Sequence, residues 1–254
     1  MIGLVEDTEN GHQKYEHFLA NQPQHVFPCA VVSVARSDLK KPEDYLVGQA
    51  IVFSAEAQLR EQGTILTGKY AAVFGYGKIG CSIAQNLQCK SVHVEVVEID
   101  PIRQVLARAH GFHTGTPESI LPKADLLFCA TGNHSLTPEN MHHIKSNAFV
   151  FSATPGDDEI EGHGRLIRKN IQQCVRGNMT KVAMGNKDFF LCNKGNSVNF
   201  LNGGVVGNFI KLIQAEFIFA AGQLPKYSCL DKIHRIENHS KEFIARLWLK
   251  HFPG

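Results

Sequence analysis

The sequence predicts an α/β fold in which a doubly wound parallel sheet carries helices on both faces, with a small lobe at the N-terminus. Three observations support this prediction. Short apolar runs alternate with helix-like stretches from residue 68 onward, which is the pattern of successive βαβ units. A glycine-rich turn joins the first of these runs to its helix. The 254 residues are enough for one large domain and a smaller lobe.

The N-terminal lobe contains two pairs of a strand and a helix. Apolar runs predict strands at residues 2–5 and 29–34. Mixed apolar and polar stretches predict helices at about 11–21 and 42–61. We place this partial lobe at residues 1–50 and the large domain at residues 51–225.

The large domain begins its sheet at residue 70, and each of its apolar runs ends at glycine, proline or polar turn residues. Helical spacing follows the first two strands, at Ile83, Ala84 and Leu87 and then over 102–109, where Gly111 closes the helix. The expected strands are 70–74, 93–99, 125–130, 148–153 and 189–192.

The C-terminal part is expected to be helical. Residues 204–222 are strongly apolar, and residues 230–252 form a basic amphipathic pattern. We assign 226–254 to a separate amphipathic helix, which would pack within the protein or in a homodimer. A membrane surface or a partner helix is the alternative for this segment.

Composition narrows the class of protein. The formal net charge is +2, and no apolar run reaches the ~18 residues that a spanning helix needs. The acidic N-terminus is unlike a secretory signal. The seven cysteines form no C-x-x-C pair, so we expect neither a metal site nor a disulfide framework. We therefore expect a cytoplasmic protein that binds a small-molecule substrate and neither nucleic acid nor a membrane.

The glycine-rich turn reads G-x-G-x-x-G in the context that this motif requires, after a strand and at the start of a helix. Gly75 would allow the tight turn, Gly77 would let a pyrophosphate approach the backbone, and Gly80 would let the helix pack closely on the strand. The free N–H groups of the helix N-terminus attract phosphates. We expect a Rossmann NAD-binding fold here; the alternative is a glycine turn without a ligand. The loop also contains Tyr76, Lys78 and Ile79.

An acidic residue, Glu98, follows Gly80 by 18 residues at the end of the next strand. This is close to the ~20 residues typical of dinucleotide-binding units. Its carboxylate would accept hydrogen bonds from the adenosine ribose and repel a 2′-phosphate, which favours NAD over NADP. Because the cationic residues Lys78 and Arg103 lie near Glu98 in the sequence, NADP stays an alternative cofactor. Thr131 and Asn133 follow a later strand, at the edge where doubly wound sheets bind ligands.

The loop and the segment 98–102 together resemble the adenosylhomocysteinase (S-adenosyl-L-homocysteine hydrolase) family, which has GYGxVG and then EIDPI at this separation. The resemblance covers roughly residues 5–230. It implies that Ile99, Asp100, Gly132 and Asn196 also contact the cofactor. The further similar segments are Glu6–Gly11, Val34–Gly48, Ala130–Asn133, Asp157–Ile160 and Gly195–Asn202.

The resemblance also implies a reaction. The family oxidises a ribose 3′-hydroxyl with tightly held NAD, eliminates or adds across the activated C4′–C5′ bond, and returns the hydride. Its catalytic lysine falls on Lys40, its aspartate on Asp44 and its glutamate on Asp7, one methylene shorter. A buried lysine beside an acid could act as the base, so we expect Asp44 to orient Lys40.

The chain departs from the family at several positions. Two family histidines fall on Pro155 and Asn196, and an asparagine falls on Tyr45. The first half of the substrate domain and the C-terminal lysine and tyrosine arm have no counterpart. Three functions therefore stay open: redox chemistry on a small hydroxylated, nucleoside-like substrate, NAD binding without catalysis, and one half of a split hydrolase completed by a second chain.

Overall fold

A computed structural model describes residues 2–21, 26–227 and 230–253, and it describes only the backbone of residues 170–174. The chain separates into two compact units. Unit 1 consists of Met1–Glu43 and Val206–Gly254, and unit 2 consists of Asp44–Val205. The boundaries expected from the sequence, near residues 50 and 225, differ from these because the C-terminal segment belongs to the same unit as the N-terminal lobe.

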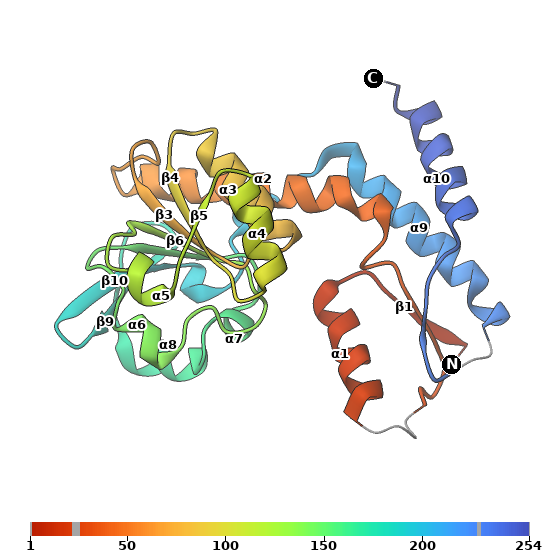
Figure 1. Ribbon diagram of the computed structural model, residues 1–254, viewed down its shortest axis with the longest axis horizontal. Helices are drawn as coiled ribbons and strands as arrows, with labels where there is room; N and C mark the ends of the chain where they lie inside the picture. Colours follow the sequence, from red (N-terminus) through yellow and green to blue (C-terminus); the bar gives the residue numbers. More distant parts are fainter. Residues whose placement is uncertain (1, 22–25, 228–229, 254) are drawn as a thin grey trace. The chain divides into compact units, whose positions relative to one another are not determined.

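Unit 2 is built on an eight-stranded sheet, counted over its described residues, in the order β5-β4-β3-β6-β7-β10-β9-β8. Figure 1 labels β3, β4, β5, β6, β9 and β10 of this sheet. Neighbouring strands from β5 to β10 run parallel, as the sequence predicts. The strands are β3 (Tyr70–Phe74), β4 (His93–Val97), β5 (His113–Thr114), β6 (Leu126–Cys129), β7 (Phe149–Ser152), β8 (Ile171–Cys174), β9 (Met179–Met184) and β10 (Lys187–Cys192).

Both faces of this sheet are buried. Ala71 and Val73 of β3 join one core cluster, whereas Ala72 and Phe74 join a second cluster on the opposite face. Alternating side chains of a strand point to opposite faces, so two clusters define a doubly wound sheet. The helices are α2 (Lys41–Glu61), α3 (Lys78–Gln88), α4 (Pro101–Ala109), α5 (Pro117–Ile120), α6 (Pro138–Met141), α7 (Gly156–Glu159) and α8 (His163–Asn170).

The far edge of the sheet differs from the expected all-parallel arrangement. Strands β9 and β10 form an antiparallel hairpin in which Met184 pairs with Lys187. The two-residue turn between them contains Gly185 at φ +61°. Such turns need a positive φ, which glycine adopts without strain. The apolar run at 189–192 predicted only the second strand of this hairpin.

The described part of unit 1 contains a three-stranded parallel sheet in the order β1-β2-β11, and its core includes Val32, Val34, Ala220 and Ile236. The helix expected at 230–252 is wrong at its start. Ile233 pairs with Val31 in the sheet, and α10 begins only at Asn238. The elements are β1 (Gly3–Glu6), α1 (Glu9–Asn21), β2 (Ala30–Ser33), η1 (Asp38–Lys40), α9 (Ile210–Gln223), β11 (Ile233–His234) and α10 (Asn238–His251). No helix in the described ranges is both long and apolar enough to cross a bilayer.

Candidate functional site

The order of strands in unit 2 reverses between β3 and β6. The chain runs outward from β3 through β4 to β5, and then returns to place β6 on the other side of β3. In doubly wound sheets, ligands bind outside the carboxyl ends of the strands at such a reversal. The loops after β3, β4, β6 and β7 therefore define the candidate site.

The glycine loop after β3 has the geometry that its spacing predicts. Gly75 has φ +84°, and a Cβ there would lie 2.8 Å from the carbonyl oxygen of Ala130. A Cβ on Gly80 would overlap the carbonyl oxygen of Gly75. Gly77 caps helix α3 and offers no side chain to the first-turn N–H groups. These donors are left for an anionic group, so the loop fits the pyrophosphate of a dinucleotide.

Glu98 connects the glycine loop to the start of α4. Its side chain is buried, its Oε2 accepts the N–H of Tyr76 at 2.6 Å, and its Oε1 accepts the N–H of Asp100 at 2.9 Å. Asp100 in turn caps α4 by accepting the N–H of Ile102 at 2.8 Å. Each carboxylate oxygen of Glu98 keeps a further lone pair for a ribose hydroxyl. Ile99 is 88 % exposed beside it.

The side chain of Tyr76 holds the glycine loop in place. Its hydroxyl lies 2.8 Å from Nδ1 of His110, and its ring packs against Phe112. Burial raises the pKa of Tyr76, and a hydrogen bond with Cys81 acts in the same direction. The tyrosine therefore stays neutral and holds the loop on the sheet. Ile79, in the first turn of α3, packs against the core cluster that contains Tyr76 and Phe112.

Lys40 and Asp44 each form an ion pair with another residue, and the orientation of Lys40 by Asp44 stays a prediction. Nζ of Lys40 lies 2.6 Å from Glu43, and both side chains are largely buried. Nζ of Lys78, the first residue of α3, lies 3.2 Å from Oδ2 of Asp44. Residues three and four positions apart both face one another on a helix, so sequence spacing alone does not choose between Glu43 and Asp44 as the partner of Lys40.

Two further loops reach the same edge of the sheet. Thr131, Gly132 and Asn133 follow β6 and are exposed. Asn196 follows β10, and its Oδ1 accepts the N–H of Gly156 at 3.3 Å, which places it beside the loop after β7. The structure therefore brings most of the predicted cofactor residues to the carboxyl edge of one sheet. Their contacts with NAD stay predictions.

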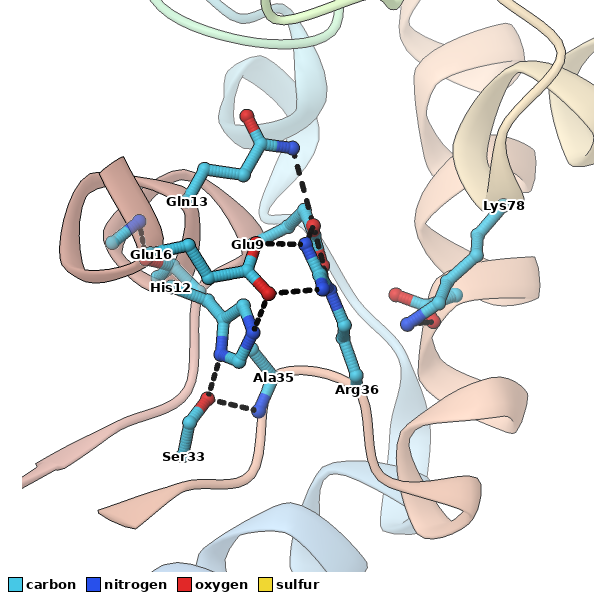
Figure 2. A network of polar contacts seen from close by, with 11 residues as sticks. Glu9, His12, Gln13, Glu16, Ser33, Ala35, Arg36 and Lys78 are labelled. Atoms are coloured by element: carbon cyan, nitrogen blue, oxygen red, sulfur yellow. Dashed lines mark hydrogen bonds and ion pairs between the residues drawn. The ribbon is translucent and has the colours of Figure 1, made fainter. Parts of the chain in front are cut away.

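A separate polar network lies in unit 1, at the ends of β1 and β2 (Figure 2). Arg36 donates to both Glu9 and Glu16. Burial raises the pKa values of Glu9 and Glu16. The hydrogen bonds and the charge of Arg36 outweigh this effect and hold the pKa values of both carboxyls below their usual range. Buried His12 lies 2.7 Å from the hydroxyl of Ser33 and 3.2 Å from Glu16.

Asp7, predicted as a catalytic residue, directly follows β1 in this unit. The carboxylate that shapes its turn belongs to the neighbouring Glu6, which accepts the N–H and the hydroxyl of Thr8 at 2.7 and 2.6 Å. The role of Asp7 stays a prediction.

Sequence reasoning assigned no individual role to three residues that the structure places in important positions, although Glu159 lies in the family-like segment Asp157–Ile160. His110 holds Tyr76, Glu159 holds the loop after β6, and Glu216 lies buried against Ser37. Each acts on a residue at least 28 positions away, so no local spacing reveals the contact. The one available signal was an acidic residue in the otherwise apolar stretch around Glu216. Among the described residues, no three His, Cys, Asp or Glu side chains are grouped to hold a metal ion.

The fold, the glycine loop and Glu98 define a dinucleotide-binding domain of the doubly wound α/β class. The model of the family described as S-adenosyl-L-homocysteine hydrolase, NAD binding domain, matches residues 53–205, which is more than half of the chain. The chain belongs to this family, and its cofactor is NAD.

Three solved structures resemble part of the chain. A dipicolinate synthase subunit from Bacillus halodurans has a TM-score of 0.49 and 13 % identity, over 63 % of this chain and 53 % of that chain. A glyoxylate reductase from Paecilomyes thermophila has a TM-score of 0.41 and 14 % identity, over 55 % and 47 %. The pyruvate reductase of Chlamydomonas reinhardtii has a TM-score of 0.41 and 17 % identity, over 52 % and 44 %. The chain thus spans about half the length of these proteins.

Proposed function

We propose that the chain binds NAD across the carboxyl edge of the large sheet and uses it for redox chemistry on a small hydroxylated, nucleoside-like substrate. The observation that carries this proposal is the hydrogen bond from the N–H of Tyr76 to Glu98. It holds an acidic side chain against the glycine loop, where a ribose bound by that loop would meet it.

The residues of unit 2 would divide the work of binding. The uncapped first turn of α3 would hold the pyrophosphate. Glu98 would accept from the adenosine ribose, and its charge would exclude a 2′-phosphate. Bound NAD would accept a hydride from a secondary alcohol. The exposed loop at Thr131 and Asn133 would lie beside the reactive half of the cofactor.

Lys40 is the proposed proton acceptor, by its resemblance to the family lysine. To act as a base, it would have to give up its ion pair with Glu43, which is 2.6 Å long and only 13–15 % exposed. The oxidation of a hydroxyl needs a group that takes its proton as the hydride leaves. A substrate that displaces Glu43 would provide the trigger.

The same ion pair supports a second candidate, which is NAD binding without catalysis. A lysine that stays paired with Glu43 is not available to a substrate hydroxyl. The chain would then serve as an NAD-dependent regulator or as one half of a split hydrolase completed by a second chain.

The deciding experiment measures NAD binding by calorimetry and then hydride transfer by the absorbance of reduced nicotinamide. Nucleosides and simple secondary alcohols are the substrates. We expect reduced nicotinamide to form with wild-type protein, to fall at least 100-fold in Lys40→Ala, and to persist in Lys41→Ala. Lys41 is a matched control because it is 71 % exposed and pairs with Asp38 at the surface.

Three other results would change the conclusion. NAD binding with no turnover on any substrate would favour the second candidate. Co-purification of a second chain that restores turnover would favour the split hydrolase. Failure of wild-type protein to bind NAD would contradict every version of the proposal.

A further inference from the structure

Glu159 is a fully buried carboxylate at the end of α7, and its hydrogen bonds converge on the loop after β6. Its Oε1 accepts the N–H of Gly132 at 2.9 Å and the hydroxyl of Thr154 at 2.7 Å. Its Oε2 accepts the N–H of Thr131 at 3.2 Å, the hydroxyl of Thr131 at 2.9 Å and the hydroxyl of Ser135. All five of these donors are neutral groups, and four belong to the segment 131–135.

These contacts occupy the hydrogen-bond donors of the loop after β6. The N–H groups of Thr131 and Gly132 go to Glu159, that of Asn133 goes to the hydroxyl of Thr131, and that of His134 goes to the carbonyl of Asp158. Four consecutive backbone N–H groups are therefore occupied inside the protein. A loop in this state is a poor phosphate site, since phosphates are bound by free N–H groups.

The loop after β3 has the opposite character. Its N-cap, Gly77, has no side-chain bond to the first turn of α3, so that loop presents donors. The loop at Thr131–Asn133 is exposed, and because its N–H groups are taken, the polar groups that it can still offer are backbone carbonyl oxygens and the carboxamide of Asn133. Acceptors of this kind suit ribose hydroxyls and a carboxamide NH₂ group.

The strand order decides which half of a dinucleotide each loop meets. Glu98, at the end of β4, lies on one side of β3, and β6 lies on the other side. With the adenosine ribose at Glu98 and the pyrophosphate at α3, the second half of the dinucleotide extends over β6 and β7. That half is the nicotinamide riboside, whose ribose hydroxyls and carboxamide are donors.

We infer that Glu159 is a positioning residue for the nicotinamide half of NAD. By holding the donors of segment 131–135 inside the protein, it fixes the acceptors of that loop toward the nicotinamide riboside and contributes nothing to binding of the adenosine half. This inference rests on the proposed function, because it assumes that the adenosine ribose lies at Glu98.

The test compares NAD with ADP, which has the adenosine and the diphosphate but lacks the nicotinamide riboside, by calorimetry on the full chain. Glu159→Gln replaces one acceptor oxygen with an NH₂ group that faces a donor, so the loop must rearrange. We expect its affinity for NAD to fall at least 10-fold, while its affinity for ADP stays within 2-fold of wild type. Glu161→Gln, two residues on and exposed, should leave both affinities unchanged.

A second variant keeps the test decisive if Glu159→Gln does not fold. Thr154→Val removes one of the five donors, and we expect a smaller loss, about 3-fold, for NAD only. Equal losses of NAD and ADP affinity, or no loss in either, would overturn the inference. Absence of ADP binding by wild-type protein would instead contradict the proposed function, so the two failures are distinguishable.

Discussion

The carboxylate of Glu98 lies 2.6 Å from the backbone nitrogen of Tyr76, 22 residues earlier in the chain. One hydrogen bond thus joins the residue that would select the ribose to the loop that would hold the pyrophosphate. The two recognition elements are fixed relative to each other before any ligand arrives, which lowers the entropic cost of binding.

Replacing Glu98 with glutamine tests this selection. We expect Glu98→Gln to weaken NAD binding about 10-fold, because hydrogen bonds to a charged acceptor contribute roughly twice as much as neutral ones. Binding of NADP should improve, because the charge that repels its 2′-phosphate is gone. Calorimetry with both cofactors measures the ratio. A matched control is Glu118→Gln, an exposed carboxyl at α5, and a ratio unchanged in Glu98→Gln would argue against a ribose at this site.

Replacing Gly80 with alanine tests the packing of α3 on β3. The new Cβ would overlap the carbonyl oxygen of Gly75, which is backbone and cannot rotate away. We expect Gly80→Ala to destabilise unit 2 by about 3 kcal/mol, measured by urea unfolding. Gly222→Ala is the control, because a Cβ there meets nothing within 4 Å. Equal stability of the two variants would show that the loop is not closely packed.

The buried carboxyl of Glu216 should make the stability of unit 1 depend on pH. Burial raises the pKa of Glu216 above its ordinary value of 4.5, although a hydrogen bond from Ser37 opposes this. The charged groups that influence it are Asp38, Lys40 and Lys241. Because the folded state holds the proton of Glu216 more tightly than the unfolded state, the contribution of this carboxyl to the free energy of unfolding is fully present below pH 4.5. It declines as the pH rises through the folded pKa, by about 1.4 kcal/mol for every tenfold difference in proton affinity between the two states.

Unfolding of wild type and Glu216→Gln between pH 4 and pH 9 measures this effect. We expect the decline in stability above pH 4.5 to become shallower in Glu216→Gln and to stay as in wild type in Glu242→Gln. Glu242 is a suitable control because it is an exposed glutamate on α10. Parallel pH profiles for wild type and Glu216→Gln would contradict the assignment.

The sequence by itself determined the elements that depend on residues close together in the chain. The glycine loop, helix α3 and Glu98 lie within one βαβ unit, and their spacing reflects steric rules that hold wherever the motif occurs. The doubly wound sheet followed for the same reason, since alternating strands and helices leave few ways to bury both faces. These features predicted the cofactor that the family match supports.

Tertiary structure alone decided the partners of the charged groups and the edges of the fold. Lys40 pairs with Glu43, and Glu159 holds a loop 28 residues earlier. The C-terminal strand β11 completes a sheet begun at residue 3. Such contacts depend on which side chains meet after the chain has folded, and a charge placed in a sequence pairs with whichever opposite charge or donor the fold brings within reach. The sequence therefore predicted the loop and the acidic residue that we expect to bind NAD, whereas the three-dimensional packing decided which residues support them.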